Sequence, residues 1–253
     1  AFVEALGEYF PVTEYFGFIP FIDFNQYWTF IMEESLFQAT LVTVSIAFAG
    51  TVLGIAPAVF FAVMSSERVV PYPFNFLFRA VMSVIRAIPA LVWVLILIPL
   101  GGGGAFTATL AIGIDTIGYL GRLLSDELEE ISEGPIEGTR SVGASKFQVI
   151  SFGMLSQVAR EFIAWLAFDL EHNVRVAIGL GIIGAGGLGL ELNIQRQTFN
   201  FTEMMACILL TILLVGSVEV MSQRVRSYLR ESDEVETRGI VSILLNAPRR
   251  TIN

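Results

Sequence analysis

Residues Leu36 to Met64 form a long stretch of the chain without a single charged side chain. An α-helix rises about 1.5 Å per residue, so about 20 apolar residues cross the hydrocarbon core of a membrane, and this stretch is longer than that. It therefore predicts a membrane-spanning helix. Its Gly50 and Gly54 form a G-x-x-x-G pair, which permits close contact with another helix.

The composition extends this prediction to the rest of the chain. Of its 253 residues, 54% are hydrophobic and 15% are charged, whereas soluble domains carry about 25% charged residues. We therefore predict an all-α, polytopic transmembrane helical bundle with five spans. The predicted spans are 36–64, 74–100, 105–127, about 160–181 and 204–222.

Charged side chains divide the chain into three regions. Residues 1–33 are aromatic and acidic and contain no Lys or Arg, so we predict short interfacial helices on the outer surface. Residues 34–230 form the transmembrane domain, and its loop at 129–157 is predicted to be cytoplasmic because cations accumulate in inner loops. Residues 231–253 form a charged cytoplasmic tail. An outer N-terminus followed by five spans that end inside indicates one more span before this segment.

The rarer residue types exclude several kinds of site. The single cysteine, Cys207, excludes an internal disulfide, and the single histidine, His172, excludes a multi-histidine metal centre. No catalytic arrangement of Ser, His and carboxylate residues is evident, so we expect neither enzymatic activity nor a cofactor. The chain has 24 acidic and 15 basic residues, with Lys146 as its only lysine. This usage is typical of proteins in high salt, and a halophilic source is a hypothesis beside ordinary drift.

Charged residues inside the predicted spans are candidates for a translocation pathway: Arg86, Asp115, Glu171 and Arg175. A charge at the centre of a bilayer costs about 2.5–3.5 kcal/mol on insertion scales, so such residues face the bundle interior or a watery pathway. Glu171 and Arg175 are four residues apart, and an alternative interpretation is a purely structural ion pair. Arg86 has no such local partner. We interpret His172 as a hydrogen-bonded structural residue.

The segment GLGIIG at 179–184 matches the G-x-G-x-x-G pattern of dinucleotide-binding folds. That fingerprint requires a preceding strand and a surrounding βαβ unit, and here it lies in an apolar membrane segment without a predicted strand. We therefore interpret these glycines as a place where helices cross closely or the backbone bends.

A polar loop with several glycines, residues 134–157, lies between two apolar segments. We predict two short helices with Gly143 at the bend between them, and a partner outside the membrane that binds the loop. The loop resembles the cytoplasmic motif of inner-membrane permeases of ATP-binding-cassette (ABC) importers, which reads E-A-A, three residues, G, nine residues, I-x-L-P. Its spacing is kept, with Glu137, Gly138 and Thr139 in the first three places, although the alanines and the final proline are not.

Further stretches resemble the phosphonate/phosphate-type branch of these permeases: 86–96, 115–145, 173–192 and the start at Glu8 to Pro11. Members of this branch usually carry histidine where this chain has Asp115. The resemblance implies a type I ABC importer permease fold in the cytoplasmic membrane. It also implies a second permease copy, two cytoplasmic ATPase subunits and an extracellular substrate-binding protein. The loop residues that it assigns to ATPase coupling are Glu137, Gly138, Thr139, Gly143, Ala144, Ser145 and Lys146.

The resemblance implies a phosphonate, phosphite or phosphate as the substrate, moved by alternating access while the separate subunits hydrolyse ATP. One alternative is a permease for another small solute, such as the amino acid methionine. A second alternative is a non-transport structural subunit of a membrane complex, and a membrane-embedded enzyme is a third.

Overall fold

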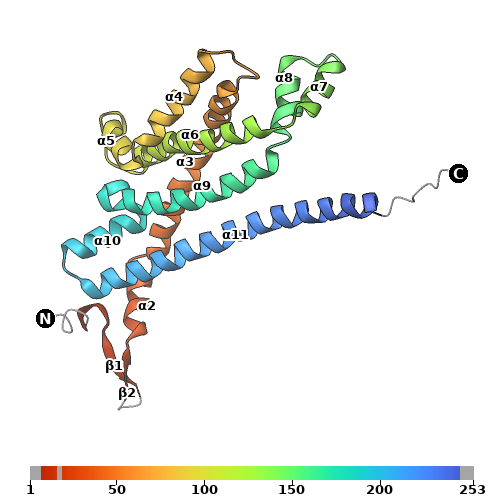
Figure 1. Cartoon of the computed structure of the whole chain (residues 1–253). Helices are drawn as coiled ribbons and strands as arrows, with labels where there is room; N and C mark the ends of the chain where they lie inside the picture. The colour runs from red at the N-terminus through yellow and green to blue at the C-terminus, as the bar shows by residue number, and fades with distance from the viewer. Residues whose placement is uncertain (1–6, 16–18, 246–253) are drawn as a thin grey trace.

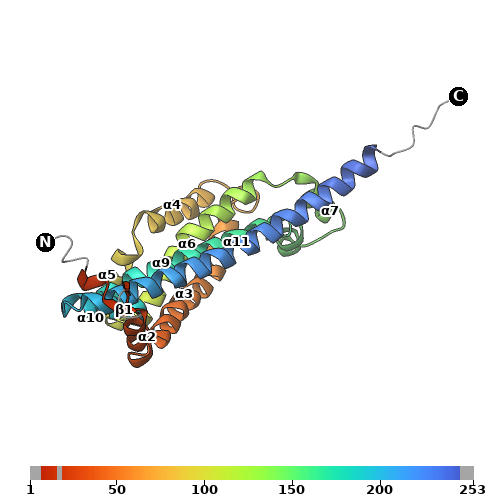
Figure 2. The same cartoon turned by 90° about the horizontal axis from the view of Figure 1, so that it is seen from below.

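The computed structural model describes the backbone of residues 7–15 and 19–245 and the side chains of residues 7–12 and 22–229. Its helices pack side by side into a bundle, from which the last helix projects (Figures 1 and 2). Residues 1–6 and 246–253, which belong to the predicted outer segment and the predicted tail, lie outside the described part of the chain.

The described chain is almost entirely helical, which confirms the all-α class. Its elements in chain order are β1 (Val12–Tyr15), β2 (Ile19–Ile22), α2 (Phe24–Glu33), α3 (Leu36–Ser65), α4 (Phe74–Ala87), α5 (Ala90–Gly101), α6 (Ala105–Glu130), α7 (Glu133–Ser141), α8 (Lys146–Gln148), the π-helical turn η1 (Val149–Leu155), α9 (Ala159–Leu180), the π-helical turn η2 (Gly181–Ala185), α10 (Gly187–Gln197) and α11 (Phe201–Leu245).

Helix α3 packs closely on α6 through the two glycines of its G-x-x-x-G pair. A Cβ at Gly50 would lie 2.5 Å from Ile112 Cγ2, and a Cβ at Gly54 would lie 2.6 Å from Thr116 Cγ2. Neither position has room for a side chain, so the predicted close helix contact is confirmed, and its partner is α6. Helix α9 packs beside these two helices. The hydrophobic core that the three helices share includes Ile46 and Ala47 of α3, Ala108 and Ile112 of α6, and Val174 and Ile178 of α9.

The predicted span 74–100 is not one straight helix. It divides into α4 and α5, which meet at an angle of 94°. Ile88 between them is extended (φ −98°, ψ 116°), because the ring of the following Pro89 excludes the helical conformation from the preceding residue. The straight span is therefore corrected to a broken one, which brings Arg86 to the end of α4.

The glycine-rich segment after α9 folds the chain back on itself. α9 passes through η2 into α10, and a Cβ at Gly189 would lie 2.0 Å from the Ile178 carbonyl oxygen. Gly187 has φ +70° and lies against α3, where the Leu188 N–H donates to Thr43 Oγ1 at 2.9 Å. The interpretation of these glycines as a close crossing and a bend is confirmed.

The outer segment contains one short helix, α2, as predicted, and before it a hairpin where another short helix was expected. Strands β1 and β2 pair antiparallel, with Val12 opposite Ile22. Strands β1 and β2 contain Val, Thr, Tyr and Ile, residue types that favour strands, and this local preference explains the correction. α2 then starts at Asp23, whose side chain accepts from Asn25 N. Tyr27 Oη donates to the Tyr9 carbonyl at 2.5 Å and fastens the helix to the chain that precedes the hairpin.

Two described helices are individually long and apolar enough to cross a membrane, Leu36–Ser65 and Phe201–Leu229. Two bent pairs satisfy the same criteria together, which gives up to four spans if each pair is one crossing: α4 with α5, and Lys146–Leu155 with Ala159–Ala185. Helix α6 is not among them, so the number of five spans stays a prediction. α11 continues as one helix beyond the bundle, so residues 231–245 of the predicted tail are helical.

Candidate functional site

The polar loop forms the two short helices that its sequence predicts. α7 runs over Glu133–Ser141, and α8 continues directly into η1 as a second helical segment. Gly143 between them has φ +78°, a left-handed backbone conformation that side chains with a Cβ rarely adopt. No atom lies within 4 Å of the place where its Cβ would be. The need for glycine here is therefore conformational, and the bend is located where it was predicted.

A capping box starts the second helical segment. Gln148 N–H donates to Ser145 Oγ at 3.4 Å, and Ser145 N–H donates to Gln148 Oε1 at 2.8 Å. This reciprocal pair satisfies two backbone donors at the helix start and fixes the position of Lys146, the first helical residue. The S-x-x-Q spacing in the sequence is a known signal for such a cap, which the sequence analysis missed.

The loop is a packed unit rather than an open connection. Gln157 closes its base, since its Oε1 accepts from Ser132 N–H at 3.1 Å and its Nε2 donates to the Ser132 carbonyl at 3.2 Å. Ile136 of α7 is fully buried. It belongs to a hydrophobic cluster that also includes Val63 of α3, Leu124 and Leu128 of α6, and Val149 and Met154 of η1.

Arg68, in the turn between α3 and α4, joins this loop to the bundle. Its Nε donates to Glu133 Oε1 at 2.7 Å, and its Nη1 donates to the Leu128 carbonyl at 2.8 Å. It also reaches the Ile131 carbonyl at 3.4 Å. The guanidinium thus occupies carbonyls that the end of α6 leaves without helical partners and holds the first turn of α7. No local sequence pattern predicts these contacts, because their partners lie about 60 residues further along the chain.

The outer surface of the loop exposes both apolar and polar side chains. Val142 and Phe147 are 81% and 77% exposed, which is unusual for large apolar residues in a polar segment. The coupling residues predicted from the resemblance lie beside them: Glu137, Gly138, Ser145 and Lys146 are exposed, and Thr139 and Ala144 are partly buried. This surface has the composition of a contact site for another protein.

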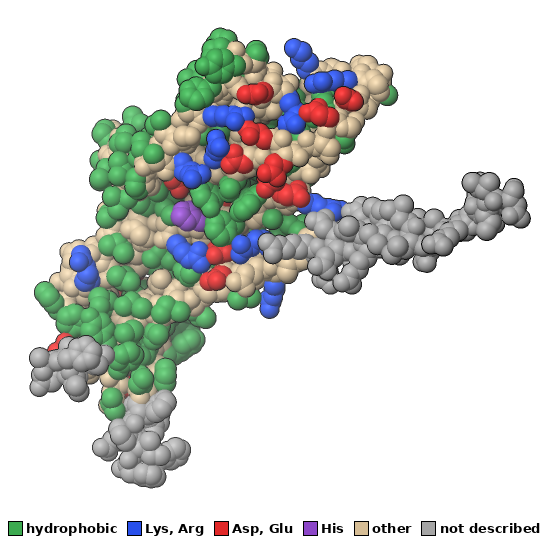
Figure 3. All heavy atoms as spheres, in the orientation of Figure 1, with side chains coloured by type: hydrophobic (Ala, Val, Ile, Leu, Met, Phe, Trp, Pro, Cys, Tyr) green, Lys and Arg blue, Asp and Glu red, His purple; other side chains and the backbone are tan. Residues whose placement is uncertain are grey.

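A second candidate region is a face over α6, α9 and α11 where charged side chains gather (Figure 3). Glu171 lies almost buried at its centre and accepts from Arg175 Nη2 at 2.8 Å. The ion pair that the four-residue spacing predicts is therefore present. Two further residues from α11 complete it: Arg226 approaches Glu171 at 3.4 Å, and Glu219 approaches Arg175 at 3.4 Å. These long-range partners have no sequence signal.

Asp115 and His172 meet between α6 and α9. The Asp115 carboxylate lies 3.8 Å from His172 Nε2, and the imidazole stacks on Tyr119 with ring centroids 5.7 Å apart. Asp115 is mostly buried, whereas the His172 side chain is 43% exposed. Asp115 therefore lies beside the charged face, but it does not contact Arg86, Glu171 or Arg175 through any interaction that the described residues show.

Arg86 lies apart from the Glu171 network. It is exposed in the last turn of α4 and lines a hollow of about 510 Å³ together with Ser83, Ala87 and Arg122. The structure therefore divides the predicted pathway residues into two groups. Glu171 and Arg175 form one ion-pair network with α11, while Arg86 faces a separate hollow whose second cation is Arg122.

A fully buried polar network lies behind the charged face and joins three helices. Thr116 Oγ1 of α6 donates to Asp169 Oδ2 at 3.0 Å, and the Asn173 amide contacts Asp169 Oδ2 at 3.0 Å and Thr51 Oγ1 of α3 at 2.8 Å. No local sequence pattern predicts the contact between Asp169 and Thr116, because the two residues lie 53 positions apart. Because α3, α6 and α9 each contribute, this network fixes their mutual rotation.

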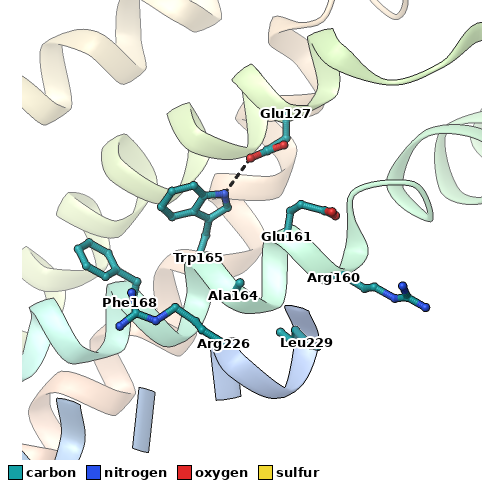
Figure 4. Close-up of a pocket in the computed structure, with 8 residues that line it drawn as sticks. All are labelled: Glu127, Arg160, Glu161, Ala164, Trp165, Phe168, Arg226 and Leu229. Carbon is teal, nitrogen blue, oxygen red and sulfur yellow. Dashed lines mark hydrogen bonds between the residues drawn. The ribbon is translucent and has the colours of Figure 1, made fainter. Parts of the chain in front are cut away.

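A pocket of about 360 Å³ opens between α6, α9 and α11 near the loop (Figure 4). Trp165 points across it, and its Nε1 donates to Glu127 Oε1 at 3.0 Å. The Arg226 guanidinium lies over the Phe168 ring at 5.3 Å from the centroid. The pocket thus continues the charged face toward the loop, with lining residues Glu127, Arg160, Glu161, Ala164, Trp165, Phe168, Arg226 and Leu229.

Comparison with known families decides the class of this chain. Residues 50–230 match the model of the family described as binding-protein-dependent transport system inner membrane component. The chain belongs to this family. Arg86, the loop and the charged face all lie inside the matched residues. An ABC importer permease, as the loop resemblance implied, is thereby confirmed.

Curated relatives of this inner membrane component are transport permeases. The phosphite transport system permease protein PtxC of Stutzerimonas stutzeri is 28% identical over 74% of this chain and 69% of its own length. The phosphate-import permease protein PhnE of Mycolicibacterium smegmatis is 33% identical over 77% of this chain, which spans only 37% of that relative. A probable D-methionine transport system permease protein MetI of Vibrio cholerae is 27% identical over 76% of this chain and 91% of its own length.

A solved structure confirms the fold of this inner membrane component. A chain from the inward-facing MetNI methionine ABC transporter superposes with a TM-score of 0.66 over 82% of this chain and 99% of that chain, at 20% sequence identity. At this identity the likeness concerns the fold alone.

Proposed function

We propose that this chain is the channel subunit of an ATP-driven importer that carries a small phosphorus oxyanion (phosphate, phosphite or a phosphonate) into the cell. The observation that carries the proposal is the loop between α6 and α9, a packed unit that Arg68 and Gln157 tie to the bundle and that exposes Val142 and Phe147. The names of the relatives PtxC and PhnE support the substrate class.

The partners follow from the two exposed surfaces. Two cytoplasmic ATPase subunits bind the loops of two permease copies, at Glu137, Gly138, Thr139, Gly143, Ala144, Ser145 and Lys146. The second copy covers the charged face, because an exposed arginine such as Arg175 does not face lipid inside a bilayer. An extracellular binding protein delivers the substrate to the outer end of the bundle, and the complex resides in the cytoplasmic membrane.

The loop transmits force because it moves as one body. ATP binding draws the ATPase subunits together and carries the loop with them. The Ile136 cluster keeps the loop from deforming, and Arg68 passes its displacement to the ends of α6 and α4. The bundle thereby alternates between outward-facing and inward-facing states, while hydrolysis takes place in the separate subunits.

The translocation pathway is lined by Arg86, Asp115, Glu171 and Arg175, with Arg86 in the hollow beside α4 and with Glu171 and Arg175 on the charged face. Guanidinium groups suit tetrahedral oxyanions because their N–H fork matches two oxygens at once. Glu171 holds Arg175 and Arg226, which lowers the positive potential of that part of the face. Binding along the route stays weak for that reason, and weak binding permits release.

Uptake by reconstituted proteoliposomes tests this function. The permease is combined with the ATPase and binding protein encoded beside it, and uptake of phosphate, phosphite, a phosphonate and methionine is measured with ATP or with a non-hydrolysable analogue. We expect ATP-dependent uptake of at least one phosphorus oxyanion. Uptake of methionine alone would show that the substrate is an amino acid and not a phosphorus oxyanion. If no solute is taken up and the permease binds no ATPase, a structural subunit is favoured.

A further inference from the structure

We propose that Arg86 and Arg122 form a low-affinity subsite for a tetrahedral phosphoryl oxyanion, with Asp126 as its built-in competitor. The inference rests on the proposed function only for the identity of the transported anion. It assigns the anion to the hollow between α4 and α6 rather than to the Glu171 network on α9 and α11.

A close helix contact sets the position of the two arginines. α4 lies against α6 at Gly118, where a Cβ would be 2.8 Å from Arg86 N and 3.2 Å from Arg86 Cα. Arg122 follows Gly118 by four residues, so it lies on the same side of α6, one turn further along. The two guanidinium groups therefore come from different helices to one hollow of about 510 Å³, which Ser83 and Ala87 also line.

The hollow carries an excess of positive charge. Arg86 has no ion-pair or hydrogen-bond partner among the residues whose side chains are described, and Arg122 pairs only with Asp126 there. Two cations thus face one carboxylate. Ser83 Oγ donates its single proton to the Arg79 carbonyl at 2.9 Å, so the donors available to an anion are those of the two guanidinium groups.

Comparison with the Glu171 network shows why this hollow is the stronger candidate. Arg175 is already bound by Glu171 and Glu219, and Arg226 is bound by Glu171 and lies over Phe168. Those guanidinium groups have carboxylate partners that an incoming anion would have to displace. Arg86 has no carboxylate partner in the described chain, so binding an anion stabilises its charge without displacing another group.

The Asp126 carboxylate binds Arg122 in the way that we expect of a phosphoryl oxyanion. Its Oδ1 lies 2.9 Å from Arg122 Nη2, and its Oδ2 accepts from Arg122 Nε at 3.2 Å, the two-point geometry by which guanidinium binds oxyanions. Both side chains are partly exposed, 31% for Arg122 and 49% for Asp126. The carboxylate is therefore exchangeable, and it lowers the affinity of the subsite while preserving its shape.

Two sources supply the same phosphoryl chemistry: a transported anion such as phosphate, and the headgroup of an anionic lipid. The complete permease–ATPase complex is placed in nanodiscs of phosphatidylcholine alone, or of phosphatidylcholine with phosphatidylglycerol. In a Cys207→Ala background, Ser83→Cys introduces a thiol at the edge of the hollow. The rate of its reaction with a negatively charged methanethiosulfonate reagent is measured with and without inorganic phosphate. Thr198→Cys, exposed at the end of α10, is the matched control.

We expect phosphate to slow the reaction at position 83 and not at position 198. The protection disappears in Arg86→Gln and Arg122→Gln, whose folding is checked by size-exclusion chromatography, and Arg122→Lys keeps part of it. Asp126→Asn acts in the opposite direction and lowers the half-protecting phosphate concentration by about two- to fivefold, the range for a partly exposed ion pair. Protection by phosphatidylglycerol without phosphate supports the subsite with a lipid as its ligand.

Absence of protection by either source in nanodiscs would overturn the subsite, as would protection that survives both arginine substitutions. ATP-driven uptake in the same preparation distinguishes this failure from a failure of the proposed function. Normal phosphate uptake without protection leaves the importer intact and removes the subsite. Protection without uptake of any phosphorus oxyanion would support the subsite and show that its ligand is not a transported anion.

Discussion

Carboxylate partners determine which arginines of this chain are available to bind an anion. Glu171 is 5% exposed and holds one arginine from its own helix and one from α11. Removing its charge leaves Arg226 without a counter-ion among the described residues and Arg175 with Glu219 alone. Hydrogen bonds to charged groups contribute roughly 1.5–3 kcal/mol each. At this scale Glu171 is a structural residue, whereas Arg86 has no structural task that the described contacts reveal.

Paired substitutions test this division. We predict that Glu171→Gln lowers the thermal stability of the purified permease by roughly 1.5–3 kcal/mol, since the neutral amide binds the two arginines more weakly. Arg86→Gln leaves stability within about 0.5 kcal/mol, as expected of an exposed side chain, but slows uptake. Both quantities are measured in one preparation. A less stable Arg86→Gln protein with normal uptake would make Arg86 a structural residue.

Local spacing predicted some of these residues and could not predict others. The Glu171–Arg175 pair follows from a four-residue separation on one helix, which any sequence shows. Arg226 approaches the same carboxylate from a different helix, and only the packing of α9 on α11 brings it there. The nearness of Arg122 to Arg86 could not be predicted, because it depends on the contact between α4 and α6 at Gly118.

Among the elements, the loop between α6 and α9 has the features of a lever. Its two helical segments share a hydrophobic cluster with α3 and α6, and its base is closed by Gln157. Arg68 connects the turn after α3, the end of α6 and the start of α7 in one set of hydrogen bonds. Force on the loop therefore reaches the end of α6 and the turn after α3 through one side chain.

Replacing Arg68 tests that connection. We predict that Arg68→Gln reduces transport per ATP hydrolysed, because the shorter neutral side chain cannot reach Glu133 and the α6 carbonyls together. Arg196→Gln serves as the matched control, since Arg196 is exposed and its side chain hydrogen-bonds only to Asn193 among the described residues. Uptake and hydrolysis are measured in the same proteoliposomes. An unchanged ratio for Arg68→Gln would show that the force takes another route.

Sequence patterns predicted the elements well where one local rule dominates. The uncharged stretch gave α3 nearly to the residue, and Gly143 marked the bend of the loop. The break at Pro89 was missed because the whole segment 74–100 is apolar enough to suggest one span, although the proline carried the signal. The hairpin near the N-terminus was missed because aromatic residues suit both an interface helix and a strand.

For the whole molecule, we predict that the end of the bundle with the loop lies in the cytoplasm. The loop between α6 and α9 carries Arg140 and Lys146, whereas residues 1–33 carry no cation, and this asymmetry predicts the loop inside. The hairpin and α2 lie at the opposite end of α3 from the loop (Figure 1). The two sequence regions that decide the orientation are therefore at opposite ends of the bundle.

Labelling from outside tests the orientation. Cysteine is introduced at Glu14 or at Ser145 in a Cys207→Ala background, and intact cells are treated with a membrane-impermeant thiol reagent. We predict that the cysteine at position 14 reacts and that the one at position 145 reacts only after permeabilisation. The reverse pattern would invert the topology and exclude ATPase binding at the loop.

Coupling of ATP hydrolysis to transport through the loop depends on the bend at Gly143, so we test it with Gly143→Val. Valine at φ +78° forces the backbone at the bend to change. Gly134→Val is the matched control, since Gly134 lies in α7 and no atom lies within 4 Å of the place where a Cβ would be. Oxyanion uptake and ATP hydrolysis are measured together in proteoliposomes of the complete complex. We predict continued hydrolysis with strongly reduced uptake for Gly143→Val, unchanged thermal stability of the bundle, and a normal ratio for the control. A normal ratio of uptake to hydrolysis in Gly143→Val would contradict the account.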